Sequence, residues 1–409
     1  MPLRLGDIAE LLLKNICSTP AKEVHFVCDS YVKSIKNVEQ LARGETEGSF
    51  NITGGDQFRP KDFRFALKSS SFKTALLKFL LEEWKHDKYG HIIQQKKVFV
   101  THEEQSLQYT TTETGIVECS EVPELVYSHV EADTRLAYHL SVLANSMPGR
   151  NVVIRATDAD IVVILLYHAR RVNANVWMDV GHSSLNTRRF IHITRLADHL
   201  GPILCKALPG YHTLTGCDYT SSFFRKGKVN PLKIAGKNPL HLEALGSIGE
   251  ATTFDDSDSL LEKYVCSLYG QKALSSVNEA RLRIFTQKYK PTDPDSPLEN
   301  IKSLDPGMLP PCQNVLMQKI ARCNYVAYLW KYADIRDPLE YMEPTDHGRR
   351  EVDGVYLPLW FTGSQMPAVL SETMEPEDVT DAEEDDCDER DNFTDDESED
   401  ESESDEDEE

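Results

Sequence analysis

The sequence predicts an α/β fold, with a twisted, mostly parallel sheet that has helices on both faces. Three observations predict this organisation. Short β-branched segments alternate with amphipathic segments through the first 240 residues, as in parallel or mixed sheets. Beyond about residue 240 the apolar residues recur at helical spacing. Residues 375–409 hold 23 acidic residues and one basic residue. We therefore expect an α/β domain over 1–240, a helical C-terminal region over 241–365 and a disordered acidic tail over 366–409.

Apolar spacing and turn residues predict the individual elements. In the first part of the chain they are helix 6–18, strand 23–28, loop 44–60, helix 61–88 and strands 97–101 and 107–112. Next come helix 128–145, strands 151–157, 175–180 and 190–193, and helices 194–200 and 202–215. The last part predicts helices 257–269, 276–288 and 314–333, a proline-rich linker over 291–311, and an ordered stretch over 351–362. The apolar run from Ile161 to Tyr167 fits either a buried helix or a strand.

The charge and the cysteines exclude several classes of protein. The formal net charge is −23, and residues 375–409 alone carry −22, so residues 1–374 are nearly neutral. The acidic isoelectric point therefore says nothing about the ligand of the folded part. The nine cysteines form no C-x-x-C pair, which argues against a disulfide framework or a zinc ribbon. This cysteine usage fits a reducing, intracellular compartment, and we favour the nucleus over the cytoplasm.

Three short acidic stretches carry the chemistry of the chain. Glu131 and Asp133 lie at the start of the helical pattern 128–145, Asp158 and Asp160 follow the buried strand 151–157, and Asp218 lies in the turn Gly-Cys-Asp-Tyr. In an open α/β sheet, ligands bind beyond the carboxyl ends of the strands. If the strand conformation persists to Asp160, the two aspartates of the middle stretch point to the same face. Two carboxylates there repel each other unless a cation separates them, which indicates a metal site.

In order and spacing these stretches resemble the flap-endonuclease (XPG-type) branch of the PIN-like nuclease superfamily. That family has an acidic pair at the start of a helix, a D-x-D pair after a central strand, and an acidic residue in a G-[SC]-D-Y turn. A strand that ends in an aspartate with basic residues behind it is similar to Asp29 with Lys36 and Arg43. The resemblance covers roughly residues 20–240 and implies a PIN-like fold over 1–240.

The sequence also departs from the family pattern in two places. The family's first strand and its catalytic aspartate should precede helix 6–18, where this sequence begins. We therefore expect one central strand and one carboxylate to be missing. The segment after Asp218 also lacks a clear glycine-rich helix–two-turn–helix pattern.

The resemblance implies a divalent-metal-dependent phosphodiesterase that acts on DNA or structured nucleic acid. Two Mg²⁺ (or Mn²⁺) ions would activate water and stabilise charge on the phosphate. The expected ligands are the carboxylates of Asp29, Glu131, Asp133, Asp158, Asp160 and Asp218. Lys36 and Arg43 would contact the scissile phosphate region. The alternative is a catalytically inactive PIN-like module that binds nucleic acid or protein. Retention of unpaired acids argues against it, because a binding-only site would gain stability by losing them.

Each site residue also has a structural alternative. Ser128-His129-Val130-Glu131 reads as a capping box in which Glu131 bonds the Ser128 backbone. Glu131 and Asp133 can converge only if the helix begins between them. Asp158 and Asp160 could end the strand and cap the next helix. Asp29 and Asp218 could be ordinary turn aspartates, and Asp179 ends another strand without matching a motif.

Two charged segments outside these stretches, the basic segment 225–237 and the acidic tail, have possible roles in binding nucleic acid. The segment 225–237 contains Arg225, Lys226, Lys228, Lys233 and Lys237, five positive charges that fit either phosphate contacts or a solvated face. The acidic tail either only aids solubility or competes with phosphates for this segment by intramolecular contact.

Overall fold

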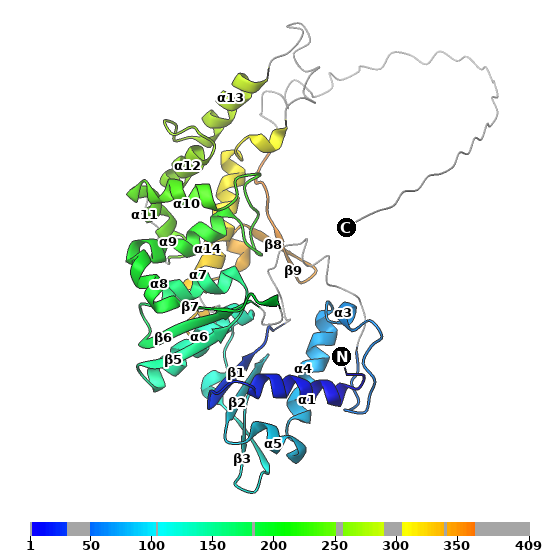
Figure 1. The fold of residues 1–409 in the computed structure, drawn as a ribbon. Coiled ribbons are helices and arrows are strands. Elements are labelled where there is room, and N and C mark those ends of the chain that lie inside the picture. Colours follow the sequence, from blue (N-terminus) through cyan, green and yellow to red (C-terminus); the bar gives the residue numbers. More distant parts are fainter. Residues whose placement is uncertain are drawn as a thin grey trace, which may run out of the picture. The chain divides into compact units, whose positions relative to one another are not determined.

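The computed structural model describes residues 2–30, 50–103, 105–181, 185–250, 257–289, 305–338 and 342–364. Lys36, Arg43 and the expected acidic tail 366–409 lie outside these residues. Residues up to Thr362 form one compact unit (Figure 1). Within the described ranges, no helix is long and apolar enough to cross a membrane.

The first half of this unit contains a four-stranded sheet and its helices. The elements are α1 (Leu5–Cys17), β1 (Glu23–Val27), α3 (Phe63–Ala66), α4 (Ser70–Glu83), α5 (Gly90–Ile93), β2 (Lys97–His102), β3 (Gln105–Thr111) and β4 (Val117–Glu121). β1 pairs with β2 in parallel, and β2–β3 and β3–β4 are antiparallel. Sequence spacing did not predict β4. The single helix expected over 61–88 is wrong, because Asp62 and Ser69 each accept a backbone N–H and begin separate helices.

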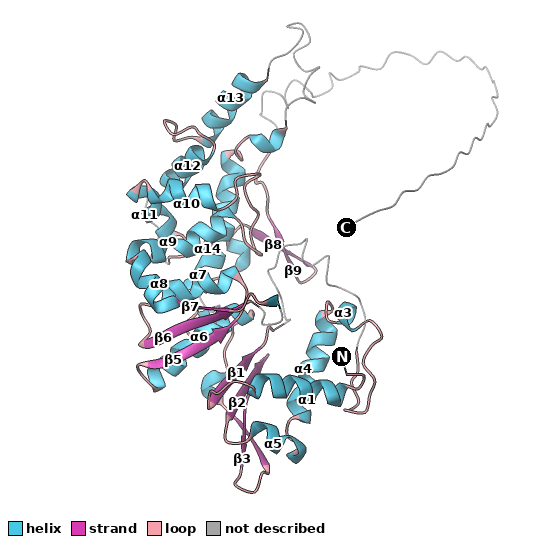
Figure 2. Ribbon diagram, viewed as in Figure 1, coloured by secondary structure: helices cyan, strands magenta, loops and turns pink. Residues whose placement is uncertain are grey.

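A three-stranded sheet follows, covered by helices (Figure 2). The elements are α6 (Ala132–Ser146), β5 (Arg150–Arg155), α7 (Ala159–His168), β6 (Ala174–Val180), β7 (Arg189–His192), α8 (Ile193–Leu200) and α9 (Pro202–Thr215). β5 pairs with β6 in parallel and β6 with β7 antiparallel. The apolar run Ile161–Tyr167 is therefore helical.

The C-terminal part is mainly helical, as expected. Its elements are α10 (Val229–Gly236), α11 (Pro239–Ser247), α12 (Ser257–Leu268), α13 (Val277–Lys288), α14 (Gln313–Lys331), and the hairpin β8 (Arg349–Val352) and β9 (Val355–Pro358). The main apolar core contains Leu140 of α6, Leu214 of α9, Leu245 of α11 and Trp330 of α14. Side chains from both sides of residue 240 therefore share one core. A second core joins α1 and α4 with β2 and β3.

The mixed α/β class is confirmed, but the expectation of one mostly parallel sheet is wrong. Among the described strands only β1–β2 and β5–β6 are parallel, and these two pairs belong to different sheets. β1 and β5 begin side by side, since Arg150 Nη1 lies 3.1 Å from Glu23 Oε2, and α6 packs against both strands. Each strand has a hydrogen-bonded neighbour on one edge only among the described strands. We call the gap between the unpaired edges of β1 and β5 the open junction. It separates strands that the sequence predicted to lie in one sheet.

A buried arginine fixes the segment between the two sheets. Arg135 of α6 is 1% exposed and donates to the carbonyl oxygens of His129, Cys28 and Glu103, at 2.7, 2.8 and 3.3 Å. These carbonyls belong to the segment before α6, the end of β1 and the β2–β3 turn. One guanidinium therefore connects three backbone segments around the start of α6.

We expect Arg135→Met to lower the free energy of unfolding by about 3–5 kcal/mol, because it keeps the apolar volume but leaves buried carbonyls without donors. Arg336→Met is the matched control, since Arg336 is exposed while it also donates to two carbonyls, of Val126 and Pro123. We expect a loss of less than about 1 kcal/mol for this control. Urea unfolding of both variants is the measurement. Equal losses would contradict the role given to Arg135.

Candidate active site

The start of α6 holds one acidic pair. The helix begins at Ala132, and Glu131 is its N-cap residue in extended conformation, with φ −98° and ψ 143°. Asp133 lies in the first helical turn. The helix thus begins between the two carboxylates, which is the condition for their convergence. The capping-box alternative is wrong, because Ser128 lies outside the helix and its backbone N–H donates to Asp337 Oδ1 at 3.1 Å.

The cap of α6 comes instead from the distant residue Asp29. Its Oδ1 accepts the Ala132 backbone N–H at 2.7 Å, across 103 positions of sequence. A carboxylate at a helix N-terminus satisfies a free donor and interacts favourably with the helix dipole. Asp29 therefore has a structural role, and that role places it beside Glu131 and Asp133.

The second acidic pair lies at the start of α7. β5 ends at Arg155 and α7 begins at Ala159, so the extended conformation does not persist to Asp160 and the condition for both aspartates to share a strand face is not met. Asp158 is exposed and caps the helix, accepting the Asp160 backbone N–H at 2.9 Å. Asp160 is 5% exposed, and its Oδ1 lies 2.8 Å from His212 Nε2 of α9. The capping alternative thus holds for Asp158, while Asp160 faces inward with a histidine partner.

Electrostatics link the two pairs with Asp29. The pKa of the half-buried Asp133 is raised to about 8. Burial is the largest cause, and the negative charges of Asp158, Asp160, Asp29 and Glu131 add to it. Because these interactions weaken with distance, the five carboxylates share one neighbourhood. They come from three chain segments that lie 29–160 in the sequence. Asp133 is therefore protonated over much of the neutral range in the absence of a cation.

The Gly-Cys-Asp-Tyr turn borders this group through its tyrosine. Tyr219 is 7% exposed, and burial followed by the charges of Glu131, Asp133 and Asp160 raises its pKa well above the usual value. Asp218 itself is exposed. Gly216 has φ +109°, and a Cβ there would lie 2.7 Å from Ser222, so the turn needs glycine.

The other candidate residues lie in different surroundings. Asp179 forms two hydrogen bonds with Arg188, at 2.9 and 2.7 Å, and this partner lowers its pKa. Lys228 donates to the carbonyl oxygens of His212 and Gly216 at the end of α9, so its ammonium stabilises a helix terminus. Lys226 Nζ lies 4.0 Å from the ring centre of Tyr269. Arg225, Lys233 and Lys237 are exposed.

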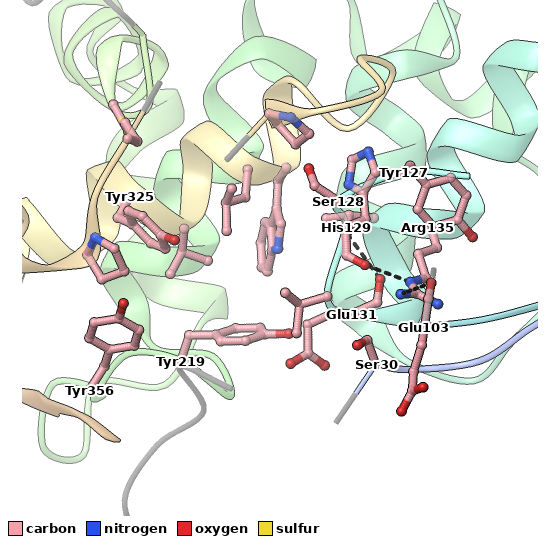
Figure 3. Close-up of a pocket in the computed structure, with 18 of the residues that line it drawn as sticks. Ser30, Glu103, Tyr127, Ser128, His129, Glu131, Arg135, Tyr219, Tyr325 and Tyr356 are labelled. Atoms are coloured by element: carbon pink, nitrogen blue, oxygen red, sulfur yellow. Dashed lines mark hydrogen bonds between the residues drawn. The ribbon is translucent and has the colours of Figure 1, made fainter. Parts of the chain in front are cut away.

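Sequence reasoning missed a cavity of about 860 Å³ beside the carboxylates (Figure 3). Glu131, Tyr219 and Ser30 line the part near the acidic group, and Tyr325 and Tyr356 line the other end. It also missed His212, the partner of Asp160. His212 could have been noticed because it lies one helical turn before Gly216. Nothing in the residue spacing of α14 and β9 indicated a cavity.

The donor chemistry suits magnesium or manganese, which prefer carboxylate oxygens. In the parts of the chain that are described, however, no three His, Cys, Asp or Glu side chains are placed so that they could hold one metal ion together. The carboxylates therefore form an acidic neighbourhood and not a preassembled coordination shell. Mutual repulsion favours such separation as long as no cation screens it.

Comparisons with known proteins add no family to this geometry. No protein-family model matches the chain, and searches of curated proteins and of solved structures found no match either.

We expect Asp133→Asn to stabilise the fold in alkaline solution without metal. The folded-state pKa of about 8 exceeds the ordinary 3.8, so ionisation of Asp133 costs stability progressively as the pH rises from about 4 to 8. One pH unit of displacement corresponds to about 1.4 kcal/mol, so we expect a gain of at least about 1 kcal/mol at pH 8. Urea unfolding at pH 4 and pH 8 is the measurement. A gain that is no larger at pH 8 than at pH 4 would contradict the assignment.

Proposed function

We propose that the chain is a divalent-metal-dependent nuclease, similar to flap endonucleases, that hydrolyses phosphodiesters of DNA or structured nucleic acid. The observation that carries this proposal is the placement of acids from three segments around the starts of α6 and α7: Asp29 caps α6 beside Glu131 and Asp133, and Asp160 faces inward with His212 as its partner. The raised pKa of Asp133 agrees with this placement. Burial and like charge destabilise such a group unless a cation joins it, and perturbed groups of this kind cluster at functional sites. Stability alone gives no reason to keep these acids together.

The roles of the side chains follow from their contacts. Asp160 is oriented by His212 and would present a fixed oxygen to a metal ion. Asp158, Glu131 and Asp133 would supply further oxygens, and Asp29 would act from its capping position. Two bound Mg²⁺ or Mn²⁺ ions would activate water and neutralise charge on the phosphate. Asp218 borders the group through Tyr219, and phosphate contacts by Lys36 and Arg43 are part of the same proposal.

A second candidate is a catalytically inactive PIN-like module that binds nucleic acid or protein. It draws support from the structural use of two carboxylates, because Asp29 caps α6 and Asp158 caps α7. Retained acids would then be explained by helix capping. Asp133 and Asp160 also lie in the first turns of α6 and α7, where negative charge interacts favourably with the helix dipole. That interaction does not account for the burial of Asp160 or the raised pKa of Asp133, which favours the nuclease.

Cleavage of nucleic acid should depend on metal and on the carboxylates of α7. We expect Asp158→Asn and Asp160→Asn to reduce the cleavage rate at least about 100-fold, because each removes a ligand charge from the site. Asp198→Asn is the control, since exposed Asp198 pairs with Arg170 on the surface, at 2.9 Å. Flap, nicked and single-stranded substrates with Mg²⁺ or Mn²⁺ would be assayed. Cleavage that survives both variants, or excess chelator, would exclude this mechanism.

Metal should also stabilise the protein in the absence of substrate. At a concentration one hundred times the dissociation constant, a bound ion adds about 2.7 kcal/mol to the free energy of unfolding. We expect Mg²⁺ or Mn²⁺ to raise the melting temperature of the wild type at pH 8, and to have a much smaller effect on Asp133→Asn. Melting measured with and without chelator tests this. Equal shifts in both proteins would place the bound ion elsewhere.

A further inference from the structure

The open junction leaves two strand edges without a neighbour. Among the described strands, β1 forms a ladder only with β2, and β5 only with β6. Along their lengths the backbones of β1 and β5 are farther apart than one strand spacing of about 4.8 Å, whereas α6 packs against both strands. Each edge therefore presents backbone N–H and C=O groups to the junction that no described strand bonds.

The side chains beside the junction are also incompletely covered. All five residues of β1 are only partly buried, while five of the six residues of β2, which has a neighbour on each side, are buried. In β5, the side chain of Val153 is 56% exposed. Parallel strands normally have both faces covered. The two strands at the junction thus lack contacts that a strand between them would supply.

The two edges are suited to the same added strand. Arg150 at the start of β5 bridges to Glu23 at the start of β1, and both strands run toward the acidic group that follows them. Successive residues of an extended strand direct their backbone groups to opposite edges, so one strand can bond a neighbour on each side. A strand parallel to both would therefore join the two sheets across the junction.

The residues that border the junction define the chemistry of the added strand. His25 of β1 lies 2.7 Å from His139 of α6, so Phe26 faces away from α6, and it packs against the core of α1 and α4. Ile154 of β5 belongs to the core that contains α6, so Val153 also faces away from α6. Apolar side chains thus border the junction on both faces. A strand between them needs a nearly continuous apolar, β-branched sequence without proline.

We propose that the open junction is a docking site for an extended apolar strand of another polypeptide, which pairs in parallel with β1 and β5 at once. Addition of a peptide strand to an exposed sheet edge is a known mode of recognition, in which main-chain hydrogen bonds supply affinity. The strands of the described chain already lie in ladders, so a second copy has no free strand among them to insert. The inference does not depend on the proposed nuclease activity.

The experiment uses the full chain and a labelled synthetic peptide, Lys-Lys-Val-Ile-Val-Ile-Val-Lys-Lys. Two control peptides carry N-methyl groups, one on every valine and the other on every isoleucine. Each control keeps its backbone donors toward one side only, so it can add to a single edge but cannot bond two edges. Hydrogen exchange of the backbone amides is measured with and without each peptide.

Peptide affinity is also measured for Val153→Lys and for Val229→Lys, after thermal melting has shown that both variants are folded. Val229 is the matched control, because it is 69% exposed and lies on α10. We expect Val153→Lys to weaken binding about tenfold, because the added strand covers that side chain. Val229→Lys should bind like the wild type.

We expect the unmethylated peptide to slow amide exchange at least about tenfold in both β1 and β5, and to leave β4 and β7 unchanged. Neither methylated peptide should bind. Binding of either one, or protection confined to one of the two strands, would show addition to a single edge and overturn the proposal. Unchanged exchange in β1 and β5 would overturn it as well. Protection of the same amides that rises with protein concentration without peptide would assign the junction to a second copy instead.

Discussion

The hydrogen bond from the Ala132 backbone N–H to Asp29 determines how the acidic group is arranged. It connects the end of β1 to the beginning of α6, and Arg135 reinforces the connection by donating to Cys28 and His129. With the first turn capped from outside, Glu131 stays extended and Asp133 is already helical. Their carboxylates can then lie on one side, which a regular helix would forbid for residues two apart. The same tie brings Asp29 itself into the group.

The carboxylates of this group are not equivalent. Asp160 has a partner in His212, and Asp158 accepts a helix N–H, so both have compensating contacts. Asp133 instead has a pKa raised by burial and by four like charges. The energetic cost is thus concentrated on one residue in the middle of the group. Such an arrangement gives a cation the most to gain at Asp133, since its charge would interact with all the acids at once.

Much of the local structure was predictable, because it depends on spacing within short segments. The alternation of apolar residues predicted β1, β2, β3, β5 and β6, and the apolar stripes predicted α1, α6, α9 and α14. The aspartates at the ends of β1 and β5 and the glycine turn before Asp218 were visible in the same way. The prediction failed where contacts between residues distant in sequence determine the helix cap or the strand neighbour. No local pattern distinguishes a capping box at Ser128 from a cap supplied by Asp29, or a parallel neighbour from the antiparallel β3.

The open junction between the two sheets is the least predictable feature and also the most informative. Glu23 and Arg150 bridge the starts of β1 and β5, and the acids that follow these strands, Asp29 after β1 and Asp158 and Asp160 after β5, all raise the pKa of Asp133. The two strands therefore run in the same direction, with α6 packed against both. A long arginine and a glutamate can span more than one strand spacing of about 4.8 Å. Among the described strands β1 and β5 share no ladder, and they lie in different sheets although their β-branched sequences predict one. The acidic group consequently depends on α6 and its Asp29 and Arg135 ties, and not on sheet pairing, for its alignment across the junction.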